Sequence, residues 1–560
     1  MKANFTCLFL IFFAAGNMAA QSYEWGGSFG GDGEDVVLKM HVDAAGNSYT
    51  TGYFSHISDF DISGEEYLLA AGEDFDIFVQ KTNPDGQLLW AKKMGGTSFD
   101  YATDIVADAN GNVYVTGVYE GIADFDPGRG EYLLESTGGL DIFIVKLDVN
   151  GDFLWAKSIG GPEYEESVAI GIDAPGNVYV SGYFYADADF DPGTAEFNME
   201  TTGFGDGFIV KLSTEGIFTW AKQFGGADFD LALNMKVTAE GDSYIVGNFR
   251  ETADFDPDPV VEFSLVAAEG NDAGYLLHLD ADGRFISAAK TGDATSGLFP
   301  MDVDRDTVGN IYITGYFGGD MAVGNVAGNE TVLQAPDFYN GFILKIDAAG
   351  STDWATQLTG DEASMVYGVA VSPEGEIMVT GYFSGMVQLG TLPLTIVSEG
   401  AMESFFGKLD ANGNFTAANQ FGGINFVDKC AIGIDAENNI YLSGAYEIVA
   451  DLNPDVNGFD MATSKGYRDN YLIKMAAAPL SVKAAEGKIA LSVYPNPTHG
   501  FVNLKASAPL YGETWKLVDL SGRKVGNGVL TASQQISLDD LANGTYILSL
   551  SGNAIKIIKE

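Results

Sequence analysis

The stretch Asp173-Ala174-Pro175-Gly176-Asn177-Val178-Tyr179-Val180-Ser181-Gly182-Tyr183-Phe184 recurs seven times, degraded to varying degrees, along a chain of 560 residues. So regular a recurrence means that one supersecondary unit is copied along the chain. The last glycine of the motif falls at Gly52, Gly117, Gly182, Gly247, Gly315, Gly381 and Gly444, at steps of 65, 65, 65, 68, 66 and 63 residues.

Each repeat is predicted to contain four β-strands. In the second repeat the strands are Tyr101–Asp108, Val113–Thr116, Asp141–Leu147 and Phe153–Lys157, which are rich in β-branched and aromatic residues. Asn-Gly pairs lie at the turns within the first and the last pair of strands, and such turns need positive φ. A loop of about twenty residues separates the second strand from the third. The unit is therefore expected to be a four-stranded antiparallel meander.

The two ends of the array predict how it closes. The segment Trp25-Gly26-Gly27-Ser28-Phe29-Gly30-Gly31 matches the last strand of a repeat, yet no other strand of a repeat precedes it. The seventh repeat supplies Cys430–Asp435, Ile440–Tyr446 and Tyr471–Met475 and lacks that last strand. The orphan strand would complete the last repeat if the array bends into a ring and so removes an exposed edge. The sequence predicts an all-β, seven-bladed β-propeller over residues 21–475; an open solenoid is the competing architecture.

The repeat resembles the bacterial seven-bladed β-propeller repeat family, whose members share the Asp-x-x-Gly-Asn-x-Tyr-x-x-Gly core. The resemblance covers Trp25 to Met475 and implies a fold, because propellers host many unrelated functions. Ser287 and Ala417 replace the tryptophan that the pattern places in the last strand of a repeat, at Trp90, Trp155 and Trp220. That tryptophan is interpreted as a packing residue, because an aromatic ring buries a large area.

Residues 1–20 have the layout of a secretory signal peptide. Lys2 precedes an apolar run from Phe5 to Ala15, and small residues follow up to Ala20, so cleavage is expected before Gln21. The run is too short to span a bilayer stably. Removal of the peptide leaves Cys430 as the single cysteine, which excludes an intrachain disulfide. No second hydrophobic stretch is expected to form an integral membrane span.

The composition changes near Ala476. Residues 476–488 are predicted to be a linker, and residues 489–560 a small β-sandwich. The tail contains 8 Lys and Arg and 6 Asp and Glu over residues 481–560, whereas the whole chain carries a formal charge of -49. So sharp a charge step supports a domain boundary. The acidic charge repels phosphates, so we expect no nucleic-acid partner.

The tail resembles the type A C-terminal sorting domain of the type IX secretion system of Bacteroidetes. The resemblance rests on ordered motifs whose principal residues are Tyr494, Pro495, Asn496, Pro497, Gly500, Gly522, Gly544 and Tyr546. It implies that the secretion machinery and a surface sortase are partners, that the tail is removed after transport, and that the cargo is released or attached to surface lipopolysaccharide. The alternative is a stabilising β-domain that is kept.

Pairs of acidic residues in three repeats are candidate Ca²⁺ ligands. The motif Asp-Phe-Asp-Pro recurs, and carboxylates two residues apart in a turn, helped by carbonyl oxygens, suit Ca²⁺. The alternative is turn chemistry, in which Asp caps the turn and Phe packs under it. A second series, Asp35, Asp100, Glu165 and Asp230, is expected at the same rim. The candidate ligands are Asp124, Asp126, Asp189, Asp191, Asp254 and Asp256, with weaker copies at Asp59–Asp61 and Asp451–Pro454.

The sequence favours a non-enzymatic binding or adhesion module on the cell surface, secreted as a monomer. His41, His56, His278 and His499 lie in none of the nucleophile or metal motifs, and no catalytic residue is assigned. Ca²⁺ is the one candidate cofactor. The alternatives are an extracellular polysaccharide hydrolase or lyase, because paired carboxylates are plentiful, and a structural surface-layer component. The ligand is expected to be a glycan or a protein.

Overall fold

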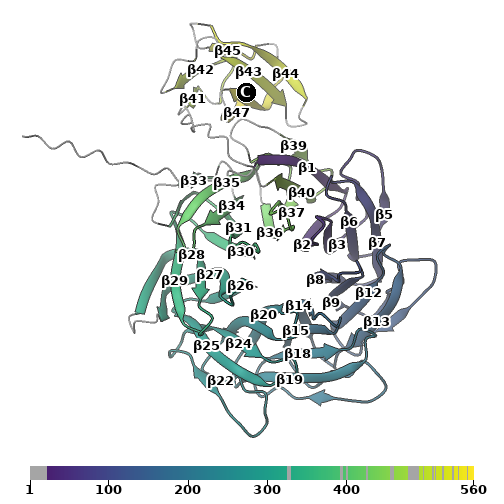
Figure 1. Cartoon of the computed structure of the whole chain (residues 1–560). Coiled ribbons are helices and arrows are strands. Elements are labelled where there is room, and N and C mark those ends of the chain that lie inside the picture. The colour runs from purple at the N-terminus through teal and green to yellow at the C-terminus, as the bar shows by residue number, and fades with distance from the viewer. Residues whose placement is uncertain are drawn as a thin grey trace, which may run out of the picture.

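The computed structural model describes residues 22–324, 330–390, 395–398, 402–423, 427–454 and 460–476, and in the tail 491–495, 497–506, 510, 513–519, 523–531, 535–539, 541–550 and 553–559. These residues form antiparallel β-sheets and no α-helix (Figure 1). The predicted signal peptide, the linker from residue 477 onward, Asn496 and Gly522 lie outside the described residues.

The recurrent motif closes the hairpin between the first two strands of a repeat. In the third repeat, Asp173 lies between β14 (Glu165–Ile172) and β15 (Val178–Phe184). Its carboxylate accepts hydrogen bonds from the Asn177 amide N–H at 2.7 Å, the Asn177 side chain at 2.7 Å and the Tyr179 hydroxyl at 3.1 Å. Gly176 takes a φ of 88°, which disfavours a side chain. The Asp, Gly, Asn and Tyr of the motif therefore together stabilise this one turn.

The first six repeats each contribute a four-stranded antiparallel unit, in which the strands lie in chain order. Figure 1 shows the units arranged around a central opening. The units are β2 (Asp35–Val42), β3 (Ser48–Phe54), β6 (Asp76–Thr82) and β7 (Leu88–Gly96); β8 (Tyr101–Ala107), β9 (Val113–Tyr119), β12 (Asp141–Leu147) and β13 (Phe153–Ile159); β14, β15, β18 (Asp206–Leu212) and β19 (Phe218–Gly226); β20 (Asp230–Val237), β21 (Ser243–Phe249), β24 (Asp272–Leu279) and β25 (Phe285–Ala294); β26 (Leu298–Arg305), β27 (Ile311–Gly324), β28 (Glu330–Ile346) and β29 (Thr352–Gly360); β30 (Ser364–Val371), β31 (Ile377–Phe383), β34 (Glu403–Leu409) and β35 (Phe415–Gly423).

A short hairpin lies between the second and third strands of most units, where the sequence predicts only a loop. In the second repeat, β10 (Ile122–Asp124) pairs with β11 (Leu133–Glu135) and also with Gly95 and Gly96 of β7 in the preceding unit. Small residues at the end of β7 allow this close approach. The other hairpin strands are β4 (Ile57–Asp59), β5 (Leu68–Ala70), β16 (Ala188–Asp189), β17 (Asn198–Met199), β22 (Thr252–Asp254), β23 (Ser264–Val266), β32 (Met386–Leu389), β33 (Thr395–Val397), β38 (Val449–Asp451) and β39 (Met461–Thr463).

The N-terminal strand β1 (Ser22–Gly31) pairs with β40 (Asp469–Ala476), more than 430 residues away in the sequence. Ser28 lies opposite Tyr471, and Trp25 lies opposite Lys474. The sheet continues through β37 (Ile440–Tyr446) to β36 (Val427–Ile434), in the order β36-β37-β40-β1. Figure 1 shows the purple strand β1 beside β40. The chain start thus supplies the fourth strand of the unit that the last repeat begins.

Apolar layers between neighbouring units form the core. One buried cluster combines Ile142 and Ile144 of β12 with Val178 and Val180 of β15 and Phe208 of β18 in the next unit. Successive side chains along a strand point to opposite faces of its sheet, so each strand packs against both neighbouring units. Each sheet is therefore covered on both faces, which explains why whole strands such as β12 and β18 are buried.

Where a fourth strand carries a tryptophan, its ring packs on the glycine of a turn in the following unit. Trp90 donates a hydrogen bond to the Val149 carbonyl at 3.0 Å, and its indole lies so close to Gly151 that a methyl group there would be 3.0 Å from the ring. The equivalent pairs are Trp25 with Gly86, Trp155 with Gly216, Trp220 with Gly283 and Trp354 with Gly413. These contacts confirm the interpretation of the tryptophan as a packing residue.

Replacing Ser287 with tryptophan is expected to stabilise the protein. Ser287 stands at the position of the tryptophan, and the space above Gly350, the glycine of the following turn, is open. Covering that glycine with an indole should add about 1 to 2 kcal/mol to the free energy of unfolding, which urea denaturation measures. Ile286→Trp, on the opposite face of the same strand, is the control. A gain no larger than that of the control would contradict the role of the contact.

The tail forms two small antiparallel sheets. One contains β41 (Leu491–Tyr494), β42 (Phe501–Ala506) and β45 (Gln535–Ser537); the other has the order β44 (Lys524–Val529), β43 (Thr514–Asp519), β46 (Gly544–Leu550) and β47 (Asn553–Lys559). Val502, Leu517, Leu548 and Ile557 share one buried cluster, so the sheets enclose a core of their own. The prediction of β-structure is correct, and β44 is a strand that the sequence pattern did not indicate, because three of its six residues are Gly or Asn.

Candidate functional site

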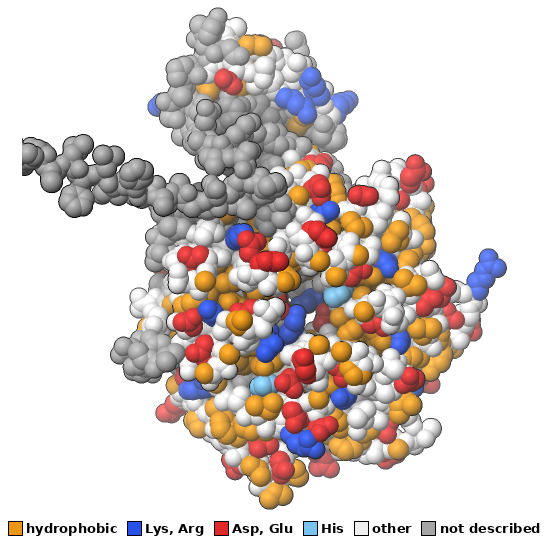
Figure 2. Space-filling model, in the orientation of Figure 1, with side chains coloured by type: hydrophobic (Ala, Val, Ile, Leu, Met, Phe, Trp, Pro, Cys, Tyr) orange, Lys and Arg blue, Asp and Glu red, His pale blue; other side chains and the backbone are white. Residues whose placement is uncertain are grey.

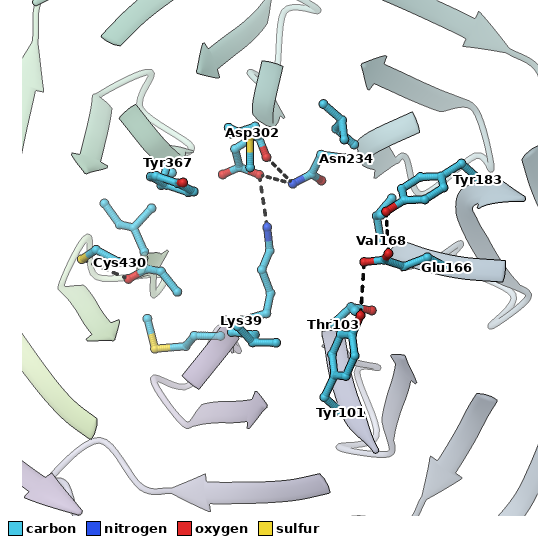
Figure 3. A pocket seen from close by; sticks show the side chains of 17 residues that line it. Lys39, Tyr101, Thr103, Glu166, Val168, Tyr183, Asn234, Asp302, Tyr367 and Cys430 are labelled. Carbon is cyan, nitrogen blue, oxygen red and sulfur yellow. Dashed lines mark hydrogen bonds and ion pairs between the residues drawn. The ribbon is translucent and has the colours of Figure 1, made fainter. Parts of the chain in front are cut away.

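A cavity of about 250 Å³ lies where the first strands of the repeats converge. Figure 3 shows its lining side chains arriving from strands on all sides. Residues from β2, β8, β14, β20, β26, β30 and β36 line it. Its volume corresponds to roughly eight water molecules, so it can hold one small group and is open to a larger ligand at its mouth.

Lys39 and Asp302 form an ion pair across the cavity. Their Nζ and Oδ1 atoms are 3.4 Å apart, Asn234 donates to the same oxygen at 2.9 Å, and the Val369 amide N–H donates to the other oxygen at 2.9 Å. Burial alone would lower the pKa of Lys39, but the Asp302 and Asp104 carboxylates outweigh it, so the pKa is raised. The lysine therefore stays charged, and Figure 3 shows it reaching from β2 toward Asp302.

Further charged groups lie on the first strands of the units, near that ion pair. Lys236 and Asp304 are 2.7 Å apart, and Asp104 accepts a hydrogen bond from the Ile170 amide N–H at 2.8 Å. Burial raises the pKa of Asp104 to about 6, although the positive charge of Lys39 opposes the shift. Burial, together with the charge of Lys236, lowers the pKa of His41 to about 4, so this histidine is neutral at physiological pH. Figure 2 shows basic side chains near the centre of one face, around a hollow.

Tyrosines and one glutamate form the other part of the lining. Tyr101 and Tyr183 both donate their hydroxyl hydrogens to Glu166, at 3.5 and 2.5 Å. Burial, followed by the nearby Glu166 charge, raises the pKa of both phenols, so both remain donors. Figure 3 shows the two rings on either side of the Glu166 carboxylate. Glu166 is therefore held as an acceptor between two aromatic rings.

Sequence reasoning missed Lys39, Asp302 and Asn234, although the repeat contains a signal for them. Their equivalents in the seven repeats are spaced 65, 65, 65, 68, 66 and 63 residues apart, the same steps as the motif glycines. Each follows a β-bulge in the first strand, and a bulge re-aims a side chain. The seven equivalent residues are Lys39, Asp104, Ala169, Asn234, Asp302, Gly368 and Ala431. At this position the side chain varies from a charged group to none, whereas the neighbouring motif residues recur. This variation within a regular repeat is the sequence signal for the residues around the cavity.

The carboxylates predicted to bind Ca²⁺ lie in turns outside this cavity. Asp124 accepts hydrogen bonds from the Asp126 and Tyr132 amide N–H groups at 3.0 and 2.8 Å, and Asp126 accepts one from Gly128 at 2.8 Å. Phe125 beneath them is fully buried. The same bonds recur around Asp189, Asp191, Asp254 and Asp256. Turn chemistry thus accounts for these residues, and Ca²⁺ binding stays a prediction; within the described residues no group of three or more His, Cys, Asp or Glu could hold a metal ion.

The second acidic series forms buried pairs with acids at the start of the third strands. Asp100 accepts a hydrogen bond from the Gly96 amide N–H at 2.7 Å, and Asp76 lies on the other side of Gly95. A methyl group on Gly95 would be 2.3 Å from the Asp76 Oδ1 atom and 3.0 Å from the Asp100 Oδ2 atom, so glycine is required there. The other pairs are Asp35 with Asp469, Glu165 with Asp141 and Asp230 with Asp206.

Burial raises the pKa of these acids, and the paired acid adds to the shift. The pKa reaches about 7 for Asp35, Asp100 and Glu165 and about 8 for Asp230. One oxygen each of Asp76, Glu165, Asp206, Asp230 and Asp469 is buried without a hydrogen-bond partner. A proton on one member of a pair can supply the missing donor, so these acids are expected to titrate near neutral pH.

His278 and Cys430 do not have the surroundings of catalytic groups. His278 stacks on Tyr244 with ring centroids 4.1 Å apart, and burial lowers its pKa. Cys430 lines the cavity, but burial raises the pKa of its thiol to about 11, which makes it a poor nucleophile.

The sorting-motif residues lie in the tail. Tyr494 ends β41, and Tyr546 donates to the Ala542 carbonyl at 2.6 Å. A side chain on Gly500 would meet the Asp539 carboxylate at 2.5 Å. Pro495 and Pro497 follow β41, and Gly544 begins β46. The described motif residues therefore hold turns and strand ends and not a site open to a ligand.

Comparison with known proteins identifies the tail. Residues 492–560 match the family model of the secretion system C-terminal sorting domain. The chain is accordingly a secreted, cell-surface protein that leaves the cell by type IX secretion. Within the described residues no helix is long and apolar enough to cross a membrane.

The repeat region has distant relatives. An uncharacterized WD repeat-containing protein of Acanthamoeba polyphaga mimivirus is 23% identical over 444 residues, covering 65% of this chain and 31% of the viral protein. Regulatory protein FlaEY of Caulobacter vibrioides is 25% identical over 357 residues, covering 60% of this chain and 35% of its own length. This chain thus spans about a third of these curated relatives.

A solved structure also aligns with the chain. The quinohemoprotein alcohol dehydrogenase ADHIIG of Pseudomonas putida HK5 is 11% identical, with a TM-score of 0.38, covering 86% of this chain and 79% of the enzyme. A similarity this low supports no inference about activity.

Proposed function

We propose that this protein is a cell-surface binding module built as a seven-bladed β-propeller, with its ligand at the axial cavity. The blades are the four-stranded units of the repeats, the last made of β36, β37, β40 and β1. The pairing of β1 with β40 and the packing of Trp25 on Gly86 support a closed ring. The repeat motif supports membership of the bacterial seven-bladed propeller repeat family.

The pairing of the charged groups in the cavity carries the proposal of binding without catalysis. Hydrolysis of a glycosidic bond needs one carboxylic acid that donates a proton and one carboxylate that is free to attack or to activate water. Asp302 is engaged by Lys39, Asn234 and a backbone amide, and Glu166 accepts hydrogen bonds from two phenols. Groups held in this way suit recognition of a ligand more than proton transfer.

Blocking the cavity is expected to abolish ligand binding. Thr103 lines the cavity, and Thr103→Trp would fill it, whereas Thr194→Trp on an exposed loop is the control. Arrays of glycans and of extracellular proteins, probed with the purified mature protein, should give signals that the cavity variant loses and the control keeps. Unchanged signals in the cavity variant would refute the site. Release of shortened glycan products would instead establish the hydrolase or lyase.

Whether the tail is cleaved from the protein can also be measured. We propose that a surface sortase removes residues 489–560 after transport. The intact mass of the protein recovered from the cell surface should then end before residue 489. A mass that includes the whole tail would establish a retained β-domain.

We propose weak Ca²⁺ binding at the Asp124, Asp189 and Asp254 turns, and the recurrence of two carboxylates two residues apart in each turn supports it. Their Oδ2 atoms and neighbouring carbonyls would be the ligands. Isothermal titration calorimetry should detect heat on adding Ca²⁺, and Asp126→Asn should reduce it. No heat, together with an unchanged melting temperature in EDTA, would exclude this binding.

A further inference from the structure

We infer that the axial cavity is the centre of an aromatic surface that binds a neutral polysaccharide chain. This inference rests on the proposed function, because it names the ligand class of the same site. The evidence for it is three rows of aromatic side chains, each of which begins at a tyrosine that lines the cavity and continues through ring-to-ring contacts.

The first two rows begin at the tyrosines that hold Glu166. In the first, Tyr101 contacts Phe99 at 5.2 Å between ring centroids, Phe99 contacts Phe75 at 5.3 Å, and Phe75 contacts Tyr53 at 5.0 Å. Tyr53 also contacts Tyr101 at 6.5 Å, so these four rings form a closed group beside the cavity. In the second, Tyr183 contacts Tyr185 at 5.7 Å, Tyr185 contacts Phe229 at 6.2 Å, and Phe229 stacks on Phe204 at 5.5 Å. Glu166 joins the two rows at the cavity.

The third row begins at Tyr367, which also lines the cavity. Tyr367 stacks on Tyr382 at 5.1 Å and contacts Tyr316 at 6.2 Å. Tyr316 in turn contacts Phe299 at 4.9 Å and Tyr339 at 5.4 Å. All three rows are built from the starts of first and third strands and the ends of second strands, which lie at the same end of every unit.

The outer rings of the second and third rows are open to solvent. Phe204 is 65% exposed, and Phe229 and Tyr339 are each 39% exposed. Large apolar rings that stay exposed at a pocket mouth mark an interaction site more often than chance exposure does. A row of rings suits a chain-like ligand, because each ring can take one successive unit.

The charges of the cavity and of the whole chain favour a neutral ligand. The Lys39 charge is paired with Asp302, and the Glu166 carboxylate already accepts hydrogen bonds from two hydroxyl groups, so these charged groups of the lining are engaged by neighbouring side chains. The chain as a whole carries -49, which repels polyanions such as nucleic acids and acidic glycans. Rings alone would also accept nucleobases, but the phosphates that accompany the bases oppose their approach.

A neutral sugar chain complements this surface chemically. The C–H bonds of a sugar ring carry partial positive charge and can lie against the negative face of a phenyl or phenol ring. Glu166, the tyrosine hydroxyls and Asn234 provide acceptors and donors for sugar hydroxyls, which are both donors and acceptors. The cavity volume of about 250 Å³ admits a single sugar-sized group, while the rest of the chain lies along the rows.

Affinity electrophoresis of the mature protein tests the inference. The probes are the neutral polysaccharides mannan, laminarin and dextran, the acidic polysaccharide alginate, and polylysine. At least one neutral probe should slow the wild-type protein, and the variant Tyr185→Ala/Phe204→Ala should bind it at least tenfold more weakly. Tyr132→Ala is the control, because Tyr132 has the same 39% exposure as Phe229 but packs on Phe153, outside the rows.

The outcomes separate this inference from the proposed function. No binding of any neutral probe, or an equal loss in the row variant and the control, overturns the polysaccharide surface. If Thr103→Trp then abolishes binding of polylysine or of an extracellular protein, the cavity is still a binding site and only the ligand class is wrong. Circular dichroism melting curves of the variants must match the wild type, because the replaced rings are exposed.

Discussion

Lowering the pH from 8 to 5.5 is expected to raise the melting temperature of this protein. The buried acids Asp35, Asp100, Glu165 and Asp230 have folded-state pKa values of about 7 to 8, well above those of the same groups in an unfolded chain. At pH values between the unfolded and the folded pKa of these groups, the folded chain therefore binds more protons than the unfolded chain. The effect should amount to several kcal/mol in the free energy of unfolding, because four groups contribute in the same direction.

The sign follows from the direction of the shifts. A raised pKa contributes stability that is fully present below about pH 4, the unfolded value, and is lost as the pH rises through 7 to 8. His41 acts in the opposite direction, because its pKa falls to about 4 and its neutral form is favoured by folding above that pH. His278, whose pKa is also lowered by burial, acts in the same direction as His41. Two histidines oppose four acids, so the net stability should still fall from pH 5.5 to pH 8.

Glu165→Gln isolates one pair. The Glu165 Oε2 atom accepts the Gly161 amide N–H at 2.9 Å and its Oε1 atom has no partner, so an amide can keep the first bond and offer a donor toward Asp141. The variant should be more stable than the wild type at pH 8 and nearly equal to it at pH 5.5. Glu65→Gln, at an exposed carboxylate away from the buried pairs, is the control and should leave the pH dependence unchanged. A melting temperature that rises steadily toward pH 8 would contradict proton sharing in the pairs.

Phe29→Ala is expected to reduce the free energy of unfolding by about 3 to 5 kcal/mol, the range for large buried aromatic residues. Phe29 of β1 is buried and contacts the rings of Phe60 at 5.9 Å and Phe78 at 6.1 Å in the first unit. On its other side, β1 is hydrogen-bonded to β40 of the last repeat. The substitution therefore weakens the junction between the first and last repeats, and not only one sheet.

Urea denaturation of the variant measures this loss. Leu89→Ala, which removes a large apolar side chain that is half exposed, is the control and should cost less than about 1 kcal/mol. A loss as small as the control's would mean that the contacts of β1 do not hold the array together, and the proposed closed ring would then lose its main support.

Most strands could be predicted from the sequence because their signals are local. Asp141–Leu147 and Ile440–Tyr446 were predicted with the bounds that the structure gives. Alternation, β-branched residues and Asn-Gly turns act within a few residues, so they can be read without the fold. The hairpin β10–β11 was missed because its strands are three residues long and are held by β7 of another unit.

The sequence by itself determined the repeat, the all-β fold, the pairing partner of the first strand and the export signal of the tail. Only the tertiary structure decided which side chains meet at the cavity: Lys39 and Asp302 are 263 residues apart and belong to different units. It also decided that the acids of the second series are buried in pairs, because burial depends on the hairpin of the neighbouring unit. Local patterns specify strands and turns, whereas the direction of a side chain after a bulge, and what it faces across the axis, depend on how the units are packed.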